Sequence, residues 1–200
     1  GFGTFNFTKV PEPIAPKLDG EPSTRSLLLD PAQLERSYGT VSRKANGETT
    51  TTPPSDELKR AIFGEDAGDM RGVEPNSDQE ETRDVIGRDD RVQITNSNAY
   101  PFRTIGLLLS LTAEGEVAGA CSGALIGPRT VLTAAHCLYD HDAGWGAGFV
   151  FAPGMVEFPN APFGASMGQE VFILEGYISN YQGQYAGVIP WDIGVVRLAD

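Results

Sequence analysis

The stretch from Cys121 to Tyr139 reads CSGALIGPRTVLTAAHCLY, and it decides how the rest of the chain is interpreted. It contains both cysteines of the chain, and the second, Cys137, directly follows His136. A bond between the two cysteines would tie the backbone of the histidine to the strand before it. Two alanines precede the histidine, and their small side chains let the backbone turn close to a sheet. The stretch therefore predicts a histidine that is accessible to a ligand but fixed by a rigid scaffold, as a catalytic base must be.

The composition is that of a folded protein built from strands and turns. Hydrophobic residues make up 40% and charged residues 21% of the 200 positions, while 24 glycines and 14 prolines favour turns over long helices. The net charge of −12 argues against nucleic acid or an anionic membrane as a partner. No apolar run approaches the roughly 20 residues that a membrane-spanning helix needs. We therefore expect neither a nucleic-acid nor a membrane partner.

The two cysteines give an indication of the cellular compartment in which the protein is found. Cys121 and Cys137 suit a single disulfide, which implies an oxidising environment outside the cytosol. Two reduced and buried thiols are the alternative that the spacing alone leaves open.

Residues 1–84 differ in composition from the rest of the chain. Pro11–Pro16 and Thr49–Pro54 are rich in proline or threonine and are predicted to be extended or disordered. Two short helices are predicted between and after them, capped by Asp30 and Ser55. An acidic stretch that follows them resembles a solvated linker. The segment is either a flexible tail or a propeptide.

From Val85 onward, short strands are separated by glycine, proline and asparagine. No helical period lies between them, which indicates an antiparallel barrel or sandwich. One helical turn is predicted around His136 and a loop over Ala152–Gly168. The predicted strands are Thr104–Leu111, Ser122–Ile126, Thr130–Thr133, Gly148–Phe151, Glu170–Leu174 and Ile193–Leu198.

Asp192 is a second candidate for the chemistry, because it opens the β-branched run WDIGVVRL. Burying a carboxylate there is costly unless a group donates hydrogen bonds to it. A neutral His136 with its Nδ1 proton directed at Asp192 would satisfy the carboxylate, which would in turn fix the tautomer of the ring. A capping aspartate at the start of a strand is the alternative.

The block CSGALIGPRTVLTAAHC followed by WDIGVVRL resembles the first half of a trypsin-like (chymotrypsin-fold) serine protease. The resemblance implies an all-β fold, an antiparallel six-stranded Greek-key barrel that is the N-terminal half of a two-barrel structure, preceded by an irregular propeptide. On this likeness His136 matches the general base and Asp192 the carboxylate that orients it. Cys121 and Cys137 match the disulfide beside the histidine.

A finer likeness begins at Val85, where VIGRDDRVQITNSNAYPFRTIG resembles the mature start of the glutamyl endopeptidase branch. It implies that residues 1–84 are a propeptide or N-terminal extension and that residues 85–200 hold the first barrel. Cleavage is expected near Asp84 and Val85. The likeness also implies a secreted zymogen and cleavage of polypeptides after glutamate.

The chain departs widely from this family's pattern, because it contains no GDSGG-like segment to carry the nucleophile. Ser122 lies in a predicted strand without a glycine nest, so we interpret it as structural. We therefore expect the nucleophile and the second barrel in a C-terminal part missing from this chain, so that the chain alone is inactive. The alternative is a non-catalytic pseudo-protease that acts as a binding or interaction module.

No cofactor or metal ion is expected from the sequence. His136 and His141 are the two histidines, and neither has carboxylates at metal-ligand spacing. His141, between Asp140 and Asp142, is predicted to lie in a solvated loop.

Overall fold

The computed structural model describes residues 11–16, 29–64, 92–156 and 158–199. The predicted cleavage site at Asp84 and Val85 and the acidic linker lie outside these residues. The chain divides into two compact units, one of Gly1–Pro54 with Asn96–Asp200 and one of Ser55–Thr95. Among the described residues the second unit contains one helix, α2 (Asp56–Phe63), and the first contains the other elements.

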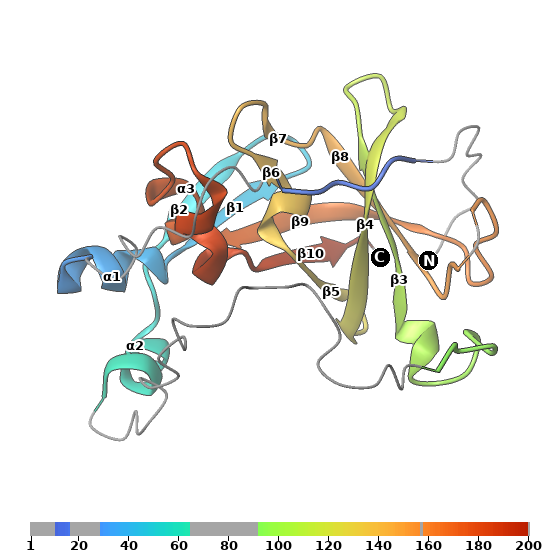
Figure 1. Ribbon diagram of the computed structural model, residues 1–200, viewed down its shortest axis with the longest axis horizontal. Helices are drawn as coiled ribbons and strands as arrows, with labels where there is room; N and C mark the ends of the chain where they lie inside the picture. The colour runs from blue at the N-terminus through green and yellow to red at the C-terminus, as the bar shows by residue number, and fades with distance from the viewer. Residues whose placement is uncertain (1–10, 17–28, 65–91, 157, 200) are drawn as a thin grey trace, which may run out of the picture. The chain divides into compact units, whose positions relative to one another are not determined.

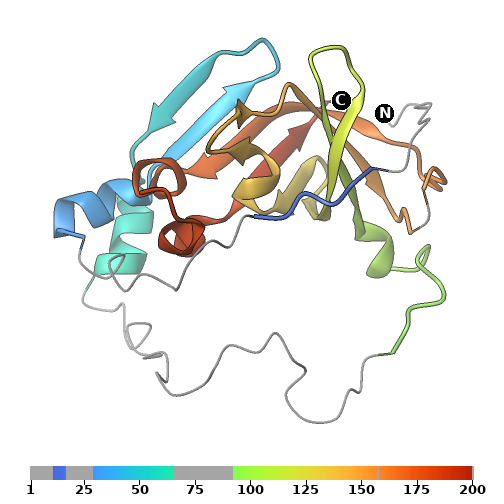
Figure 2. The same ribbon diagram turned by 45° about the horizontal axis from the view of Figure 1, so that its top comes forward.

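Six antiparallel strands of the first unit close into a barrel (Figures 1 and 2). Their order is β10-β5-β4-β3-β8-β9, and β9 pairs with β10 to complete the ring. Strands β3, β4 and β5 form a meander and β8 returns beside β3, which is a Greek key. The predicted all-β, six-stranded barrel is thus confirmed. The strands are β3 (Ile105–Leu111), β4 (Val117–Gly127), β5 (Thr130–Thr133), β8 (Gly148–Pro153), β9 (Ser166–Leu174) and β10 (Gly194–Leu198).

Apolar side chains that alternate along the strands fill the barrel. Leu108, Val131 and Phe151 are each no more than 1% exposed and belong to one cluster with residues of β9 and β10. Leu109 points to the other side of β3, where it packs with Val150 beneath the loop that follows β8. Strands β3 and β8 are therefore largely buried on both faces, which explains why their sequences are mostly apolar.

A hairpin from the N-terminal part of the chain continues the barrel sheet. Strand β1 (Thr40–Lys44) pairs antiparallel with β9, and β2 (Thr49–Thr52) pairs with β1. Val41 of β1 is buried in the main core. The sequence predicted an extended or disordered segment over Thr49–Pro54, so this hairpin was not predicted. The β-branched threonines of β2, which favour strands, pair with β1, and β1 pairs in turn with β9, far away in the sequence.

The two helices predicted before the barrel are present. Helix α1 (Pro31–Ser37) begins after Asp30, whose Oδ1 accepts a hydrogen bond from the Gln33 amide at 2.8 Å. In α2, Ser55 Oγ accepts from the Leu58 amide at 3.1 Å. None of the helices in the described ranges is long and apolar enough to cross a membrane. The remaining short elements are η2 (Phe102–Thr104), η3 (Ala135–Cys137), β6 (Tyr139–Asp140), β7 (Gly144–Trp145), α3 (Glu175–Ser179) and η4 (Tyr185–Trp191).

Candidate active site

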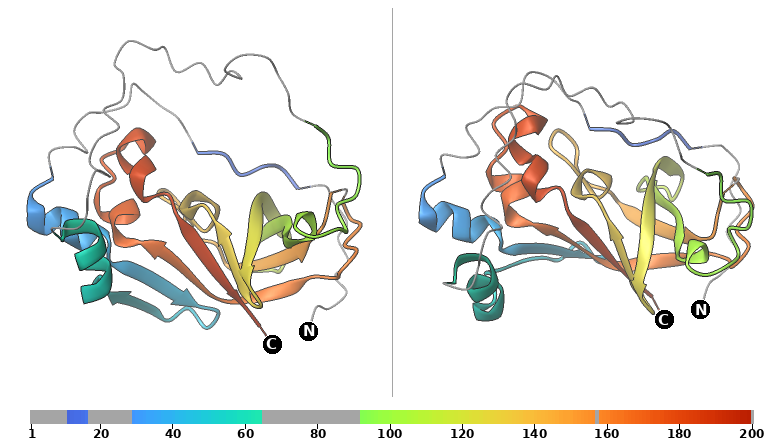
Figure 3. Two further views of the ribbon diagram at one scale, coloured as in Figure 1. Left: turned by 90° about the horizontal axis from the view of Figure 1, so that it is seen from below. Right: turned by 60° about the horizontal axis from the view of Figure 1, so that its bottom comes forward.

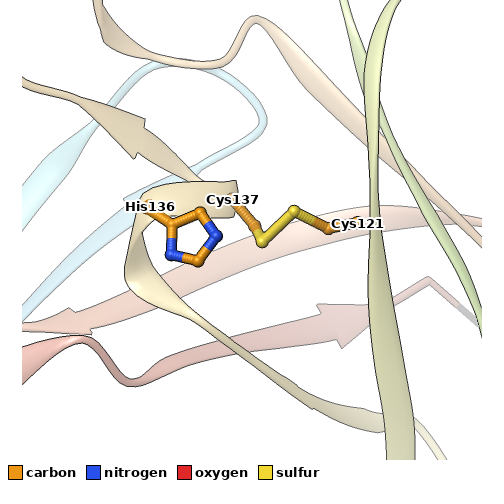
Figure 4. Close-up of side chains that lie close together, drawn as sticks. All are labelled: Cys121, His136 and Cys137. Atoms are coloured by element: carbon orange, nitrogen blue, oxygen red, sulfur yellow. A yellow bond between two sulfur atoms is a disulfide. The ribbon is translucent and has the colours of Figure 1, made fainter. Parts of the chain in front are cut away.

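His136 lies in η3, the single helical turn that follows β5. The Cys121–Cys137 disulfide joins this turn to β4, as Figure 4 shows, with the two Cα atoms 6.0 Å apart. Ala135, on the other side of the histidine, is fully buried. The backbone of His136 is therefore held from both sides, by a covalent bond and by a side chain packed in the core. The predicted disulfide is present.

Asp192 reaches His136 because β10 approaches the turn closely. The residue lies between η4 and β10, and Gly194 at the start of β10 pairs with Thr133 at the end of β5. A Cβ atom at Gly194 would lie 2.7 Å from the carbonyl oxygen of Ala134. Only glycine permits this approach, so the glycine of WDIG helps to bring the aspartate to the histidine.

Two hydrogen bonds join His136 to the Asp192 carboxylate, one from the ring and one from the backbone. His136 Nδ1 lies 2.7 Å from Asp192 Oδ2, and the backbone N–H of His136 donates to Oδ1 at 2.9 Å. The side chains are 20% and 11% exposed, respectively. With Nδ1 directed at the carboxylate, Nε2 is the ring atom available to a reactant. The structure thus brings together the two residues that the sequence singled out for base and orienting carboxylate.

Tyr185 is a third member of this site, and the sequence analysis missed it. Its hydroxyl donates to Asp192 Oδ2 and lies 3.4 Å from His136 Nδ1. Its ring meets the imidazole edge to face, with centroids 6.1 Å apart. Burial raises the pKa of Tyr185 and the hydrogen bond to Asp192 raises it further, so the hydroxyl remains a donor. No local pattern identifies this tyrosine, since only folding of η4 turns it toward the carboxylate.

The surroundings of Asp192 favour its charged form. Burial by itself raises the pKa of a carboxyl group. Hydrogen bonds from the His136 side chain, from Tyr185 and from the His136 backbone outweigh burial, and the pKa of Asp192 lies below its usual value. The aspartate is therefore negative at neutral pH, as a group that orients and stabilises an imidazolium must be.

His141 lies in the predicted loop, the turn between β6 and β7, but its ring packs among aromatic side chains, so the expectation of a solvated side chain is wrong. The His141 ring stacks on Tyr181 with centroids 3.6 Å apart and planes 3° apart, and it also contacts Tyr177. Its Nε2 is buried and has no hydrogen-bond partner among the described residues. Burial lowers the pKa of His141, although nearby carboxylates oppose the shift. A sequence with an aspartate on each side of a histidine gives no sign of tyrosines that arrive from α3 and the loop after it.

A cleft of about 530 Å³ lies beside His136. Ser122 and Thr133 line it together with the disulfide and apolar side chains. Within the described part of the chain, no serine is hydrogen-bonded to the His136 ring. The Ser122 carbonyl oxygen instead accepts a hydrogen bond from the Thr133 hydroxyl at 2.9 Å, in keeping with a structural role for this residue.

One group of possible metal ligands occurs among the described residues, formed by Cys121, His136 and Cys137. The two sulfur atoms are bonded to each other, so neither is the thiolate that a metal ion requires. His136 Nδ1 is also engaged by Asp192. These residues do not fit a metal ion.

Comparisons with known proteins found the following similarities. Residues 94–150 match the sequence model of the trypsin family. A glutamyl endopeptidase of Bacillus licheniformis is 28% identical over 194 residues, which cover 96% of this chain and 53% of the relative. A Bacillus subtilis protein named extracellular metalloprotease is 25% identical over 171 residues, covering 82% of this chain and 52% of the relative. The crystal structure of the protease Anisep from Arthrobacter nicotinovorans overlaps 49% of this chain and 42% of its own at 23% identity and a TM-score of 0.39.

The barrel, the match of residues 94–150 to the trypsin family model and the glutamyl endopeptidase relative support a likeness to trypsin-like serine proteases. The resemblance recognised from the TAAHC and WDIG segments is thereby confirmed. The chain spans about half the length of the curated relatives that it matches.

Proposed function

We propose that this chain is the N-terminal part of a secreted serine endopeptidase in which His136 is the general base. The observation that carries the proposal is the pair of hydrogen bonds by which Asp192 accepts from both the ring and the backbone of His136. This pairing fixes the proton on Nδ1 and leaves Nε2 to receive another. A histidine that only fills space does not need its tautomer held by a carboxylate that is itself mostly buried.

In the proposed reaction, a serine hydroxyl loses its proton to His136 Nε2 while its oxygen attacks the carbonyl carbon of a peptide bond. The imidazolium so formed is stabilised by ionised Asp192, and Tyr185 holds that carboxylate in place. The histidine then gives the proton to the departing amine. A water molecule, deprotonated in the same way, hydrolyses the acyl-enzyme.

The serine and the donors that stabilise the oxyanion are proposed to lie in sequence outside these 200 residues. Two observations support this. The curated relatives extend to about twice the matched length. The ring of His136 also has no serine partner among the described residues. The substrate is then a polypeptide bound between this barrel and the remaining part.

Cleavage after glutamate, a propeptide and secretion are finer parts of the proposal. A relative named glutamyl endopeptidase supports the first. The disulfide and a relative named extracellular support secretion. Activation by cleavage near Val85 rests on the likeness of the VIGRDD segment alone.

Turnover by the complete protein tests the role of His136. We expect His136→Ala to remove nearly all hydrolysis of a polypeptide substrate while the fold is retained. His141→Phe is the matched control, because it replaces the other histidine and preserves its stacking on Tyr181. Undiminished hydrolysis by His136→Ala would overturn the assignment, and absence of hydrolysis in the wild-type protein would favour the binding module.

A further inference from the structure

Residues 11–16, PEPIAP, lie against an open edge of β4 (Figures 1 and 3). Strand β5 pairs with β4 only from Ala124 onward, so this edge of the first half of β4 lacks a strand from the barrel. Ile14 N–H donates to the Ala120 carbonyl at 2.7 Å, and Ala120 N–H donates to the Glu12 carbonyl at 2.8 Å. The segment is therefore joined to the barrel by a single parallel bridge between Pro13 and Ala120.

The sequence of this segment suits such a contact. Glu12 and Ile14 turn their backbone groups toward β4, whereas Pro13 between them faces away, where its missing N–H costs nothing. Proline also restricts the free chain to extended conformations, so less entropy is lost when it binds. The outer edge of the segment lacks a donor at Pro13, which discourages addition of another strand.

The side chain of Ile14 packs against β4 at Gly119, which has no side chain of its own. A Cβ atom at Gly119 would lie 2.6 Å from Ile14 Cγ1, so the isoleucine occupies the space that any larger residue at position 119 would fill. Gly119 is buried although it borders the open edge. The contact is therefore made by complementary surfaces as well as by hydrogen bonds.

The same segment borders the space around His136. Pro11, Pro13 and Ile14 form one wall of the 530 Å³ cleft that the histidine lines. Ile14, Ala15 and Pro16 border a smaller hollow of about 80 Å³, which His136 lines together with Tyr181 and Tyr185. In Figures 1 and 2 the blue segment passes beside η3, the turn that carries the histidine. A ligand that approaches His136 through either hollow meets this segment.

We propose that the open edge of β4 at Gly119 and Ala120 is a peptide-docking surface, and that residues 11–16 are its built-in occupant and cover His136. The surface recognises an extended chain through the backbone of Ala120 and one aliphatic side chain over Gly119. As an intramolecular partner at millimolar effective concentration, the segment needs few contacts to remain bound. That the covering segment inhibits catalysis rests on the proposed protease function, whereas the position of the segment on the edge of β4 does not.

Hydrogen exchange at single amides of the 200-residue chain tests the position of the segment. We expect the Ile14 and Ala120 amides to exchange at least tenfold more slowly than the amide of Glu114, in the exposed turn before β4. Gly119→Ala places a methyl group against Ile14 and should accelerate both amides at least tenfold, and Ile14→Ala should accelerate them less. The double variant should recover part of the protection. Ile126→Ala, which truncates an isoleucine of β4 that is 62% exposed, is the matched control and should change neither rate.

Equal exchange of Ile14, Ala120 and Glu114 in the unmodified chain would overturn the proposal, as would unchanged rates in both Gly119→Ala and Ile14→Ala. Protection of β3 and β8 amides reports that the barrel remains folded. If Gly119→Ala disturbs the barrel, Ile14→Ala gives the same test, because the truncation lies outside the barrel.

Modification of His136 by diethyl pyrocarbonate tests whether the segment covers the histidine. We expect the rate to rise severalfold in Gly119→Ala and Ile14→Ala, with Ile126→Ala, which leaves the segment in place, as the reference. Exchange protection with an unchanged His136 rate in both variants would refute the covering role. Neither measurement needs a serine nucleophile, so a failure of this inference is distinguishable from a failure of the proposed protease function.

Discussion

Replacing Tyr185 with phenylalanine removes one hydroxyl from the His136–Asp192 site and little else. That hydroxyl donates to Asp192 Oδ2, and a hydrogen bond to a charged group contributes about 1.5–3 kcal/mol. Asp192 keeps two donors from His136, so the carboxylate is not left unpaired. We therefore expect Tyr185→Phe to lower the free energy of unfolding at pH 7 by about 1.5 kcal/mol, at the lower end of this range.

Denaturant unfolding of the 200-residue chain measures this difference. Tyr100→Phe is the matched control, because Tyr100 is 74% exposed and its hydroxyl should contribute almost nothing. A double-mutant cycle with Asp192→Asn should give a coupling free energy of about 1 kcal/mol between Tyr185 and Asp192.

The pH dependence of the Tyr185→Phe effect follows from the lowered pKa of Asp192. A group whose pKa is depressed by folding contributes stability that is fully present above its unfolded pKa, about 3.9 for aspartate. That contribution is lost as the pH falls through the folded pKa, and the difference between wild type and Tyr185→Phe should shrink over the same range. A Tyr185→Phe variant as stable as wild type at pH 7, or a difference that persists when Asp192 is protonated, would refute the account of this hydrogen bond.

Two further predictions concern the surroundings of the site. Burial lowers the pKa of His141, so the neutral ring contributes stability above an unfolded pKa of about 6.5, and this stability is lost as the pH falls toward the folded pKa. In His141→Phe, the free energy of unfolding should therefore change less with pH between about pH 7 and 5 than in wild type. A pH dependence equal to that of wild type would contradict this. The Cys121–Cys137 disulfide closes a loop with a sequence separation of 16, for which chain entropy predicts a stabilisation of about 3 kcal/mol. Denaturant unfolding of the Cys121→Ala/Cys137→Ala protein should show a loss of this size in the free energy of unfolding. Unchanged stability would mean that the bond does not form in solution.

The barrel strands could be predicted from sequence because each is a short run bounded by glycine or proline. Strand β5 has the predicted bounds, and β3 differs from the prediction by one residue. Strand β4 was predicted from Ser122, yet it begins at Val117. Its first half contains alanine and glycine, which are weak strand formers, and it is held in the sheet by pairing with β3.

The parts that could not be predicted depend on partners distant in the sequence. The β1–β2 hairpin needs β9, and burial of His141 needs the tyrosines near α3. The hydroxyl of Tyr185 reaches Asp192 only when η4 has formed. Proline-rich composition likewise predicted an extended chain at residues 11–16 but could not identify Ala120 as its partner.

Labelling with a fluorophosphonate tests the central claim most directly, namely that His136 and Asp192 activate a serine outside these 200 residues. The account predicts that the complete wild-type protein is labelled on one serine, that the adduct lies outside this chain, and that His136→Ala abolishes labelling while Asp192→Asn slows it strongly. An adduct on Ser122, equal labelling of wild type and His136→Ala, or no adduct on the wild-type protein would contradict it.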